Sequence, residues 1–183
     1  MKVVFLLVVT ALALVSARLT GGRLERLVRR AWRATPLAFL PLGIQAVIFS
    51  PWTSAWSPSL VMVLHLASYA GLLGFLALNW TRPGVAYLAA GTLANATVIA
   101  ANGGAMPVSE RALQGAGLHH VLAALQDGPA QNSVLLGPTS RLAVLGDVFW
   151  LPVWLPVANV FSAGDVLIAA GVFVLCHRAM KAA

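Results

Sequence analysis

Five long apolar segments dominate this sequence and restrict what it can fold into. They cover residues 3–19, 36–50, 59–79, 84–101 and 162–176. A helix needs about 20 residues to cross a bilayer, with a lower limit near 17, so the second and fifth segments need flanking residues as well. Only 9% of the residues are charged, against about 25% in soluble domains, which leaves too few to cover a water-facing surface.

These features predict an all-α fold, an integral membrane bundle of five transmembrane helices that forms a single domain over residues 1–183. Residues 102–161 form the one long segment outside the membrane, and we expect interfacial helices within it. The single cysteine, Cys176, excludes an internal disulfide and a cysteine-based metal cluster.

The positive charges predict the orientation of the bundle. Nine of the twelve basic residues fall on one side of the five segments: Arg18, Arg23, Arg26, Arg29, Arg30, Arg33, Arg82, Arg178 and Lys181. Positive loops stay in the cytoplasm, so we expect the N-terminus outside and the C-terminus inside. The tryptophans agree, because all fall near segment ends, where indole prefers the headgroup level: Trp32 and Trp80 inside, and Trp52, Trp56, Trp150 and Trp154 outside.

Two alternatives concern the number of crossings. The start, MKVVFLLVVTALALVSA, is similar to a secretory signal, but cleavage after it would leave the arginine-rich loop outside, so a retained span is favoured. The segment 142–158, LAVLGDVFWLPVWLPVA, is a candidate sixth span. It contains Asp147, Pro152 and Pro156 and would move the basic tail outside, so we interpret it as an interfacial or re-entrant piece on the outer face.

The arginine-rich loop has helical periodicity over residues 23–33. Four arginines lie away from its apolar stripe: Arg23, Arg26, Arg30 and Arg33. This pattern predicts a short amphipathic helix on the inner surface, with these arginines near anionic lipid headgroups. Docking of an acidic cytoplasmic partner is the alternative, and a plain role in setting topology is favoured over both. Because the basic residues lie between apolar runs, we expect no nucleic-acid partner.

Two stretches predict how the outer segment begins and ends. In NGGAMPVS, Asn102 ends the fourth span, Gly103 and Gly104 allow a sharp turn, and Ser109 caps a helix that runs to about residue 126, weakened at Gly115 and Gly117. In FSAGDVLIAAG, Ser162 and Asp165 have the spacing of a capping box that opens the last span. Four of the five acidic residues therefore fall on the outer side: Glu110, Asp127, Asp147 and Asp165.

Three motifs in combination resemble a known family: NGGAMPVS after the fourth span, then LGDVFWLP, then FSAGDVLIAAG. Over nearly its whole length the chain is similar to a family of uncharacterised bacterial multi-pass membrane proteins that is defined only as a domain of unknown function (DUF5317-like). The resemblance implies a small helical bundle in the bacterial cytoplasmic (inner) membrane. It implies no known activity, substrate or cofactor.

Polar residues inside apolar spans are the usual sign of a functional site. The candidate ligand-binding residues are Gln45, His65, Asn95, Asn102 and Asp165. The first three lie about 8–10 Å below the outer edge, at 1.5 Å per helical residue, and the other two lie at that edge. They predict an outward-facing polar pocket beneath the long loop. The favoured alternative is that these groups form hydrogen bonds between helices and hold the bundle together.

Other chemistry has little support in the sequence. His119 and His120 are adjacent, so on a helix they point about 100° apart and cannot easily bind one ion, even with Asp127 and Asp147 nearby. We expect no metal, no cofactor and no catalytic residues. The sequence best fits a non-enzymatic binding, accessory or scaffold protein with a membrane-protein partner or as a homo-oligomer. A small oligomeric transporter or channel is the alternative, and an intramembrane enzyme using His65 and Asp165 is the least favoured hypothesis.

Overall fold

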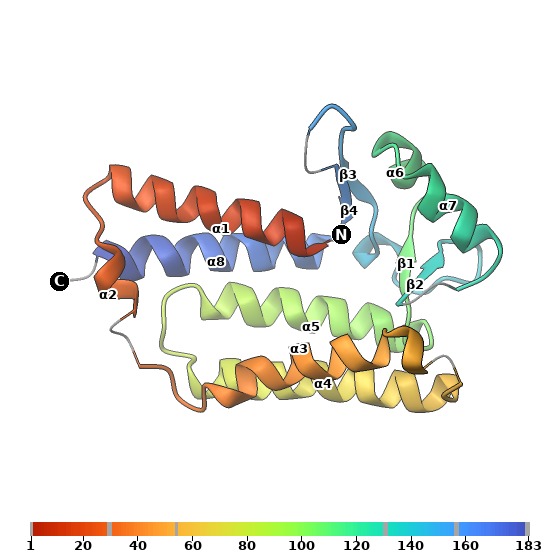
Figure 1. Cartoon of the computed structure of the whole chain (residues 1–183), viewed down its shortest axis with the longest axis horizontal. Helices are drawn as coiled ribbons and strands as arrows, with labels where there is room; N and C mark the ends of the chain where they lie inside the picture. Colours follow the sequence, from red (N-terminus) through yellow and green to blue (C-terminus); the bar gives the residue numbers. More distant parts are fainter. Residues whose placement is uncertain (1, 29–30, 54, 130–131, 156–157, 182–183) are drawn as a thin grey trace.

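The computed structural model describes residues 2–28, 31–53, 55–129, 132–155 and 158–181. Five helices run along the long axis and alternate in direction (Figure 1), and each matches one predicted segment. Their bounds are α1 Lys2–Leu19, α3 Pro36–Ile48, α4 Pro58–Leu78, α5 Val85–Ala101 and α8 Ala163–Lys181. The short helix α2, Leu24–Val28, lies at the end of the bundle that holds the C-terminus.

Local signals explain where the long helices start and stop. Pro36 and Pro58 each occupy the first turn of a helix, where the missing N–H costs nothing, and Ser57 caps α4 by accepting from the Leu60 N–H at 3.3 Å. Gly84 adopts a positive φ of 85° directly before α5. Such backbone angles favour glycine and turn the chain between α4 and α5.

Helix α8 lies between α1 and α5, while α3 packs on α4 and α4 on α5 (Figure 1). The contact between α5 and α8 is made by glycine pairs. A Cβ atom on either Gly91 or Gly164 would overlap the backbone oxygen of the other, and the same holds for Gly84 and Gly171. Small residues that let helix backbones approach closely are typical of helix contacts within membranes.

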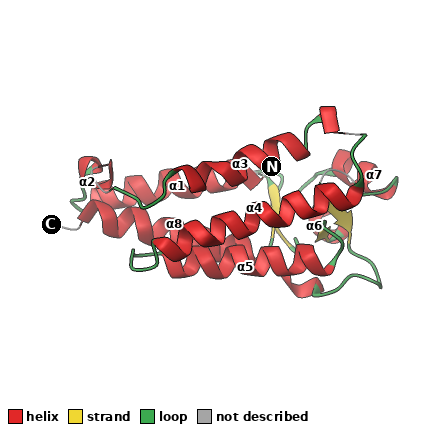
Figure 2. Ribbon diagram, turned by 90° about the horizontal axis from the view of Figure 1, so that it is seen from below, coloured by secondary structure: helices red, strands yellow, loops and turns green. Residues whose placement is uncertain are grey.

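A separate cap closes the end of the bundle opposite α2, and both views place its strands there (Figures 1 and 2). Its elements are η1 Pro51–Thr53, β1 Met106–Val108, α6 Glu110–Gly115, α7 His119–Gln126, β2 Ser133–Leu135, η2 Ala143–Leu145, β3 Phe149–Leu151 and β4 Asn159–Phe161. Strands β1 and β2 pair in parallel, and β3 and β4 pair antiparallel. The cap has its own buried core, which includes Leu113, Leu122, Leu125 and Val160.

The prediction of a purely helical fold is therefore correct only for the bundle. The cap adds two small sheets, whose three-residue strands are too short to show an alternating pattern in the sequence. The helix predicted over residues 23–33 is also too long, because α2 ends at Val28 and Ala31 is no longer helical. The described part of segment 142–158 contains only a 3₁₀ turn and strand β3, so no helix crosses the molecule there.

Two of the long helices, α4 and α8, are long and apolar enough to cross a membrane by length and composition. The other three are apolar and shorter. Many large apolar side chains on the bundle face outwards, among them Leu12, Phe39, Leu42, Val63 and Leu93, each at least half exposed. A water-soluble bundle would turn these residues inwards.

Candidate functional site

The start of α8 is joined to the middle of α5 by a closed ring of buried hydrogen bonds. The Ser162 hydroxyl accepts from the Asp165 N–H at 3.1 Å, and the Asp165 carboxylate accepts from the Ser162 N–H at 3.0 Å. This confirms the predicted capping box. Asn95 completes the ring, because its amide donates to Asp165 at 2.8 Å and accepts from the Ser162 hydroxyl at 2.8 Å. All three side chains are buried.

The glycines of the α5–α8 contact make this ring possible. A Cβ at Gly164 would overlap the Asn95 side-chain oxygen, so only glycine lets that amide lie against the first turn of α8. The helix dipole adds to the effect, since the Asp165 carboxylate lies at the positive end of α8. The sequence therefore places a negatively charged group where both the capping N–H and a neighbouring amide can satisfy it.

A second polar group joins α3, α4 and the turn after α5. The Gln45 amide donates to the Ser68 hydroxyl at 2.9 Å, and that hydroxyl donates to the His65 carbonyl at 2.6 Å. The His65 Nδ1 lies 3.0 Å from the Gly104 carbonyl, which can only accept, so Nδ1 donates. The His65 ring is buried and packs edge-on against Phe49, with ring centres 4.8 Å apart.

The third group contains Asn102, which ends α5. Its side chain donates to the Arg141 carbonyl at 2.8 Å and accepts from the Arg141 N–H at 2.8 Å, while it also donates to the Val98 carbonyl at 2.7 Å. The side chain therefore closes the end of the helix and fixes a remote loop of the cap at the same time. The predicted turn is confirmed as well, because Gly103 and Gly104 both adopt positive φ angles.

The five predicted ligand-binding residues thus belong to three hydrogen-bonded groups, and the structure joins Asn95 to Asp165 directly. Two bonds of these groups could not be recognised in the sequence: a single serine in an apolar span, such as Ser68, is too common to stand out, and the bond from Ser162 to Asn95 joins distant segments. These bonds connect neighbouring elements, as expected if the polar groups hold the bundle together.

At the opposite end of the bundle, an asparagine forms a set of hydrogen bonds that the sequence did not predict. Asn79 ends α4, donates to the Phe75 carbonyl at 2.9 Å, and holds the main chain of Arg33 through two bonds of 3.0 and 3.1 Å. This repeats the arrangement of Asn102 and Arg141. In both cases an asparagine after the last helical residue fixes a loop far away in the sequence.

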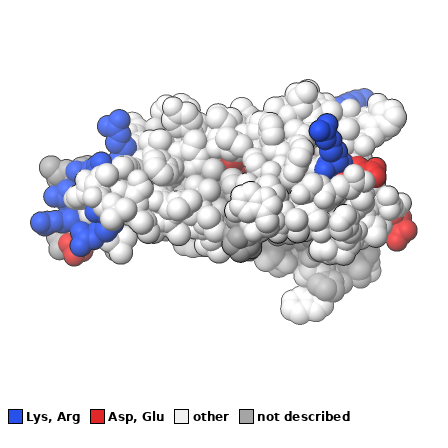
Figure 3. Space-filling model, turned by 90° about the horizontal axis from the view of Figure 1, so that it is seen from above, with Lys and Arg blue, Asp and Glu red and all other residues white. Residues whose placement is uncertain are grey.

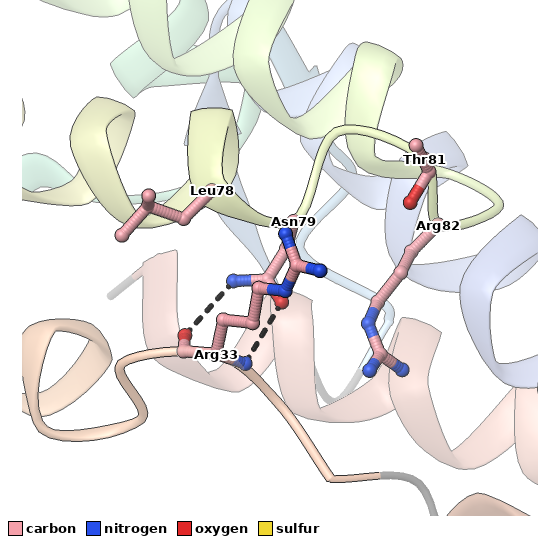
Figure 4. Close-up of a pocket in the computed structure, with 5 residues that line it drawn as sticks. All are labelled: Arg33, Leu78, Asn79, Thr81 and Arg82. Carbon is pink, nitrogen blue, oxygen red and sulfur yellow. Dashed lines mark hydrogen bonds between the residues drawn. The ribbon is translucent and has the colours of Figure 1, made fainter.

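Beside this clamp lies a hollow of about 340 Å³, shown in Figure 4. Its lining residues are Arg33, Leu78, Asn79, Thr81 and Arg82. The Arg82 guanidinium stacks on the Trp32 ring, with its carbon 4.7 Å from the ring centre, and donates to the Ala31 carbonyl. Arg33 approaches from the other side, and the Thr81 hydroxyl points towards the space between the two arginines (Figure 4).

Two of the other predicted lipid-contacting arginines, Arg23 and Arg26, lie at this same end. Arg23 is exposed, and its N–H donates to the Met180 carbonyl at 2.9 Å, which joins α2 to the end of α8. The Arg26 guanidinium donates to the Lys181 carbonyl at 3.3 Å. Arg30 lies outside the described residues. A second, mostly apolar hollow of about 380 Å³ lies nearby and is lined by Leu14, Val15, Arg18, Leu19, Leu24 and Met180.

His119 and His120 are exposed at the start of α7. Within the described ranges of the chain, no group of three His, Cys, Asp or Glu side chains is placed to hold a metal ion.

Comparisons with known proteins give a family and no further relative. Searches of curated proteins and of solved structures gave no match. The model of one family, described as a family of unknown function (DUF5317), matches residues 30–177, which include α3, α4, α5, the cap and most of α8. The chain therefore belongs to the DUF5317 family of unknown function.

Proposed function

We propose that the chain is an integral membrane protein whose five long helices all cross the bilayer, the 13-residue α3 together with its flanking turns, with the cap outside and α2 inside. The distribution of charge carries this proposal. Figure 3 shows mostly basic residues with one acidic group at one end of the visible face and charges of both signs at the other, with a broad uncharged band between them that is interrupted by one small red patch. Helix α4, with 21 residues, is about 30 Å long, which equals the thickness of the hydrocarbon core.

Two further features support the same placement. The described ends of the chain lie at opposite ends of the bundle, as an odd number of crossings requires (Figure 1). Trp52 and Trp154 are exposed at the cap end, and Trp80 is exposed at the end near α2. Exposed indoles at both ends of an apolar belt are typical of side chains anchored at the two membrane surfaces.

Within the membrane, we propose a non-enzymatic role as a binding, accessory or scaffold subunit. The polar side chains of α3, α4 and α5 bond to neighbouring helices or to the cap, and such ties hold a bundle together without moving a solute. The cap is the surface offered to a partner or ligand. A ligand-binding role for Gln45, His65, Asn95, Asn102 and Asp165 remains part of the proposal.

Cysteine labelling tests the topology with little background, because Cys176, the single native cysteine, is buried. The variants Gln126→Cys and Ala31→Cys each place one thiol at an exposed position, in the cap and near α2 respectively. In intact cells, an impermeant maleimide should label Gln126→Cys and reach Ala31→Cys only after permeabilisation. Labelling of Ala31→Cys in intact cells would overturn the proposed orientation.

Purification in a mild detergent tests the role. A scaffold should retain a fixed membrane-protein partner, and the variant His65→Ala should retain it too once its folding is verified. If His65→Ala stays folded and loses a bound small molecule, the polar groups form a ligand site. If vesicles containing the purified protein accumulate a solute, the chain is a transporter instead.

A further inference from the structure

The hollow beside Asn79 has the composition of an anion site. Two guanidinium groups, from Arg33 and Arg82, and one hydroxyl, from Thr81, line the same open space (Figure 4). Among the residues that the structure describes, no carboxylate forms a salt bridge with either arginine, and Glu25 is the only acidic residue in the first 109 positions. We propose that this hollow binds a phosphate group.

Contacts within the chain itself hold the framework of the hollow in place. Asn79 is buried and holds the Arg33 main chain at both its N–H and its carbonyl, so two hydrogen bonds tie the loop before α3 to the end of α4. Arg82 is held by the face of Trp32 and by the Ala31 carbonyl. A guanidinium has five N–H donors, so Arg82 keeps donors for a ligand after this bond. Ordering before binding lowers the entropy cost of capturing an anion.

The geometry favours phosphate over a simple halide ion. A guanidinium presents paired N–H groups that match two oxygens of one phosphate, and two arginines from different loops meet the tetrahedral group on two sides. The Thr81 hydroxyl supplies a further donor. The volume of about 340 Å³ is at the lower end of the usual range for small-ligand pockets, about 300–1,000 Å³.

The proposed membrane orientation matters here only for which molecule supplies the phosphate group. If the end near α2 faces the cytoplasm, the exposed Trp80 places the hollow at headgroup depth, and the phosphate is that of an anionic lipid. The other source is a soluble phosphate ester. Phosphate binding itself depends on the arginines and not on topology, so it can be tested separately from the cysteine labelling.

The test uses the full chain in a sugar detergent that contains no phosphate. One arm adds phosphatidylglycerol or phosphatidylcholine to the micelles and counts retained lipids by native mass spectrometry. The other arm titrates glycerol 3-phosphate and follows the melting temperature. The variants are Arg33→Gln, Thr81→Val and the double variant Arg33→Gln/Arg82→Gln. The matched control, Arg178→Gln/Lys181→Gln, removes two charges at the same end from exposed side chains that lie outside the hollow and outside the predicted lipid-contacting set.

We expect the double variant to bind the phosphate compound at least about ten-fold more weakly, and the control to change by less than about two-fold. Arg33→Gln alone should weaken binding without altering the melting temperature of the free protein, because its side chain is exposed. Selective retention of phosphatidylglycerol identifies a lipid, and saturable binding of glycerol 3-phosphate identifies a soluble ester. Equal losses in the double variant and the control, or no binding of either probe by the natural chain, would overturn the proposal.

Discussion

Two asparagines perform the same task at opposite ends of the bundle. Asn79 and Asn102 each follow a long helix, each donate to a carbonyl four residues earlier, and each hold the main chain of an arginine in a distant loop. An amide can do this because it is donor and acceptor at once. The sequence shows where these helices end, but the loop that each asparagine holds depends on tertiary packing.

Substitution of Ser162 measures how much a buried helix cap contributes to stability. Ser162→Ala removes the bond to the Asp165 N–H and leaves the buried Asn95 oxygen without its hydroxyl donor. We expect it to lower the free energy of unfolding by about 2–4 kcal/mol, the sum of a lost cap and an unsatisfied buried acceptor. Unfolding in mixed micelles of a mild detergent and dodecyl sulfate measures the change.

Ser57→Ala is the matched control, because Ser57 also caps a long helix but is exposed to its surroundings. It should cost only about 0.5–1 kcal/mol. Equal effects of the two substitutions would show that the bond to Asn95 contributes nothing to stability.

In the ring of Asn95, Ser162 and Asp165, the local bonds could be predicted from the sequence and the long-range bonds could not. The spacing of Ser162 and Asp165 predicts their capping box, since both partners lie within one helical turn. The bond from Asn95 spans 70 positions and requires knowing that α5 packs against α8. The hollow at Arg33 and Arg82 was missed for a similar reason, because the two residues belong to loops that an unpredicted asparagine clamp brings together.

At the scale of elements, the pairing of α5 with α8 depends on glycines spaced seven residues apart on both helices, Gly84 and Gly91 against Gly164 and Gly171. The antiparallel arrangement brings each glycine of one helix opposite a glycine of the other. The backbones therefore approach more closely than side chains would allow, and dispersion contacts between them increase.

Replacing a glycine by alanine should consequently lower the free energy of unfolding in α5 and raise it in α4. Gly91→Ala places a Cβ against the Gly164 carbonyl, so we expect a loss of about 1–3 kcal/mol. Gly74→Ala in α4 meets no atom within 4 Å and removes a flexible residue from a helix, so it should raise stability by up to about 1 kcal/mol. Unfolding curves of both variants in the same micelles decide the matter, and a stabilising Gly91→Ala would contradict the close packing.

Helices were predictable from sequence and strands were not. A long apolar run needs no partner to be recognised, and capping residues such as Ser57 and Ser109 mark its start. The strands of the cap are three residues long and pair with distant segments, as when Met106 aligns with Ser133, so no local pattern marks them. Segment 142–158 has enough apolar residues for a span, but its prolines and Asp147 disfavour a membrane helix, and its described part is a 3₁₀ turn and a short strand with mostly exposed apolar side chains.

At the scale of the whole molecule, the tryptophans lie away from the centre of the bundle. Every indole lies in a loop, in the cap or next to a helix end: Trp32, Trp52, Trp56, Trp80, Trp150 and Trp154. In bilayers, a nitroxide at the headgroup should therefore quench the fluorescence more strongly than a nitroxide near the end of the acyl chain.

Replacing the exposed Trp52, Trp80 and Trp154 with phenylalanine should remove most of the difference between the two quenchers. Equal or stronger quenching from the bilayer centre would contradict the placement of the helices across the membrane.

The position of α8 between α1 and α5 has a consequence for biogenesis. The ribosome makes α8 after α1 and α5, so under the proposed topology the nascent chain holds α1 and α5 in the bilayer before their common neighbour exists. Until then Ala13 and Ala17, which are fully buried in the finished bundle, lack their packing partners on α8 and would face lipid or an insertion chaperone under that topology. Assembly is thus completed only after α8 has been synthesised, and a chain released before α8 would be a substrate for quality-control proteases.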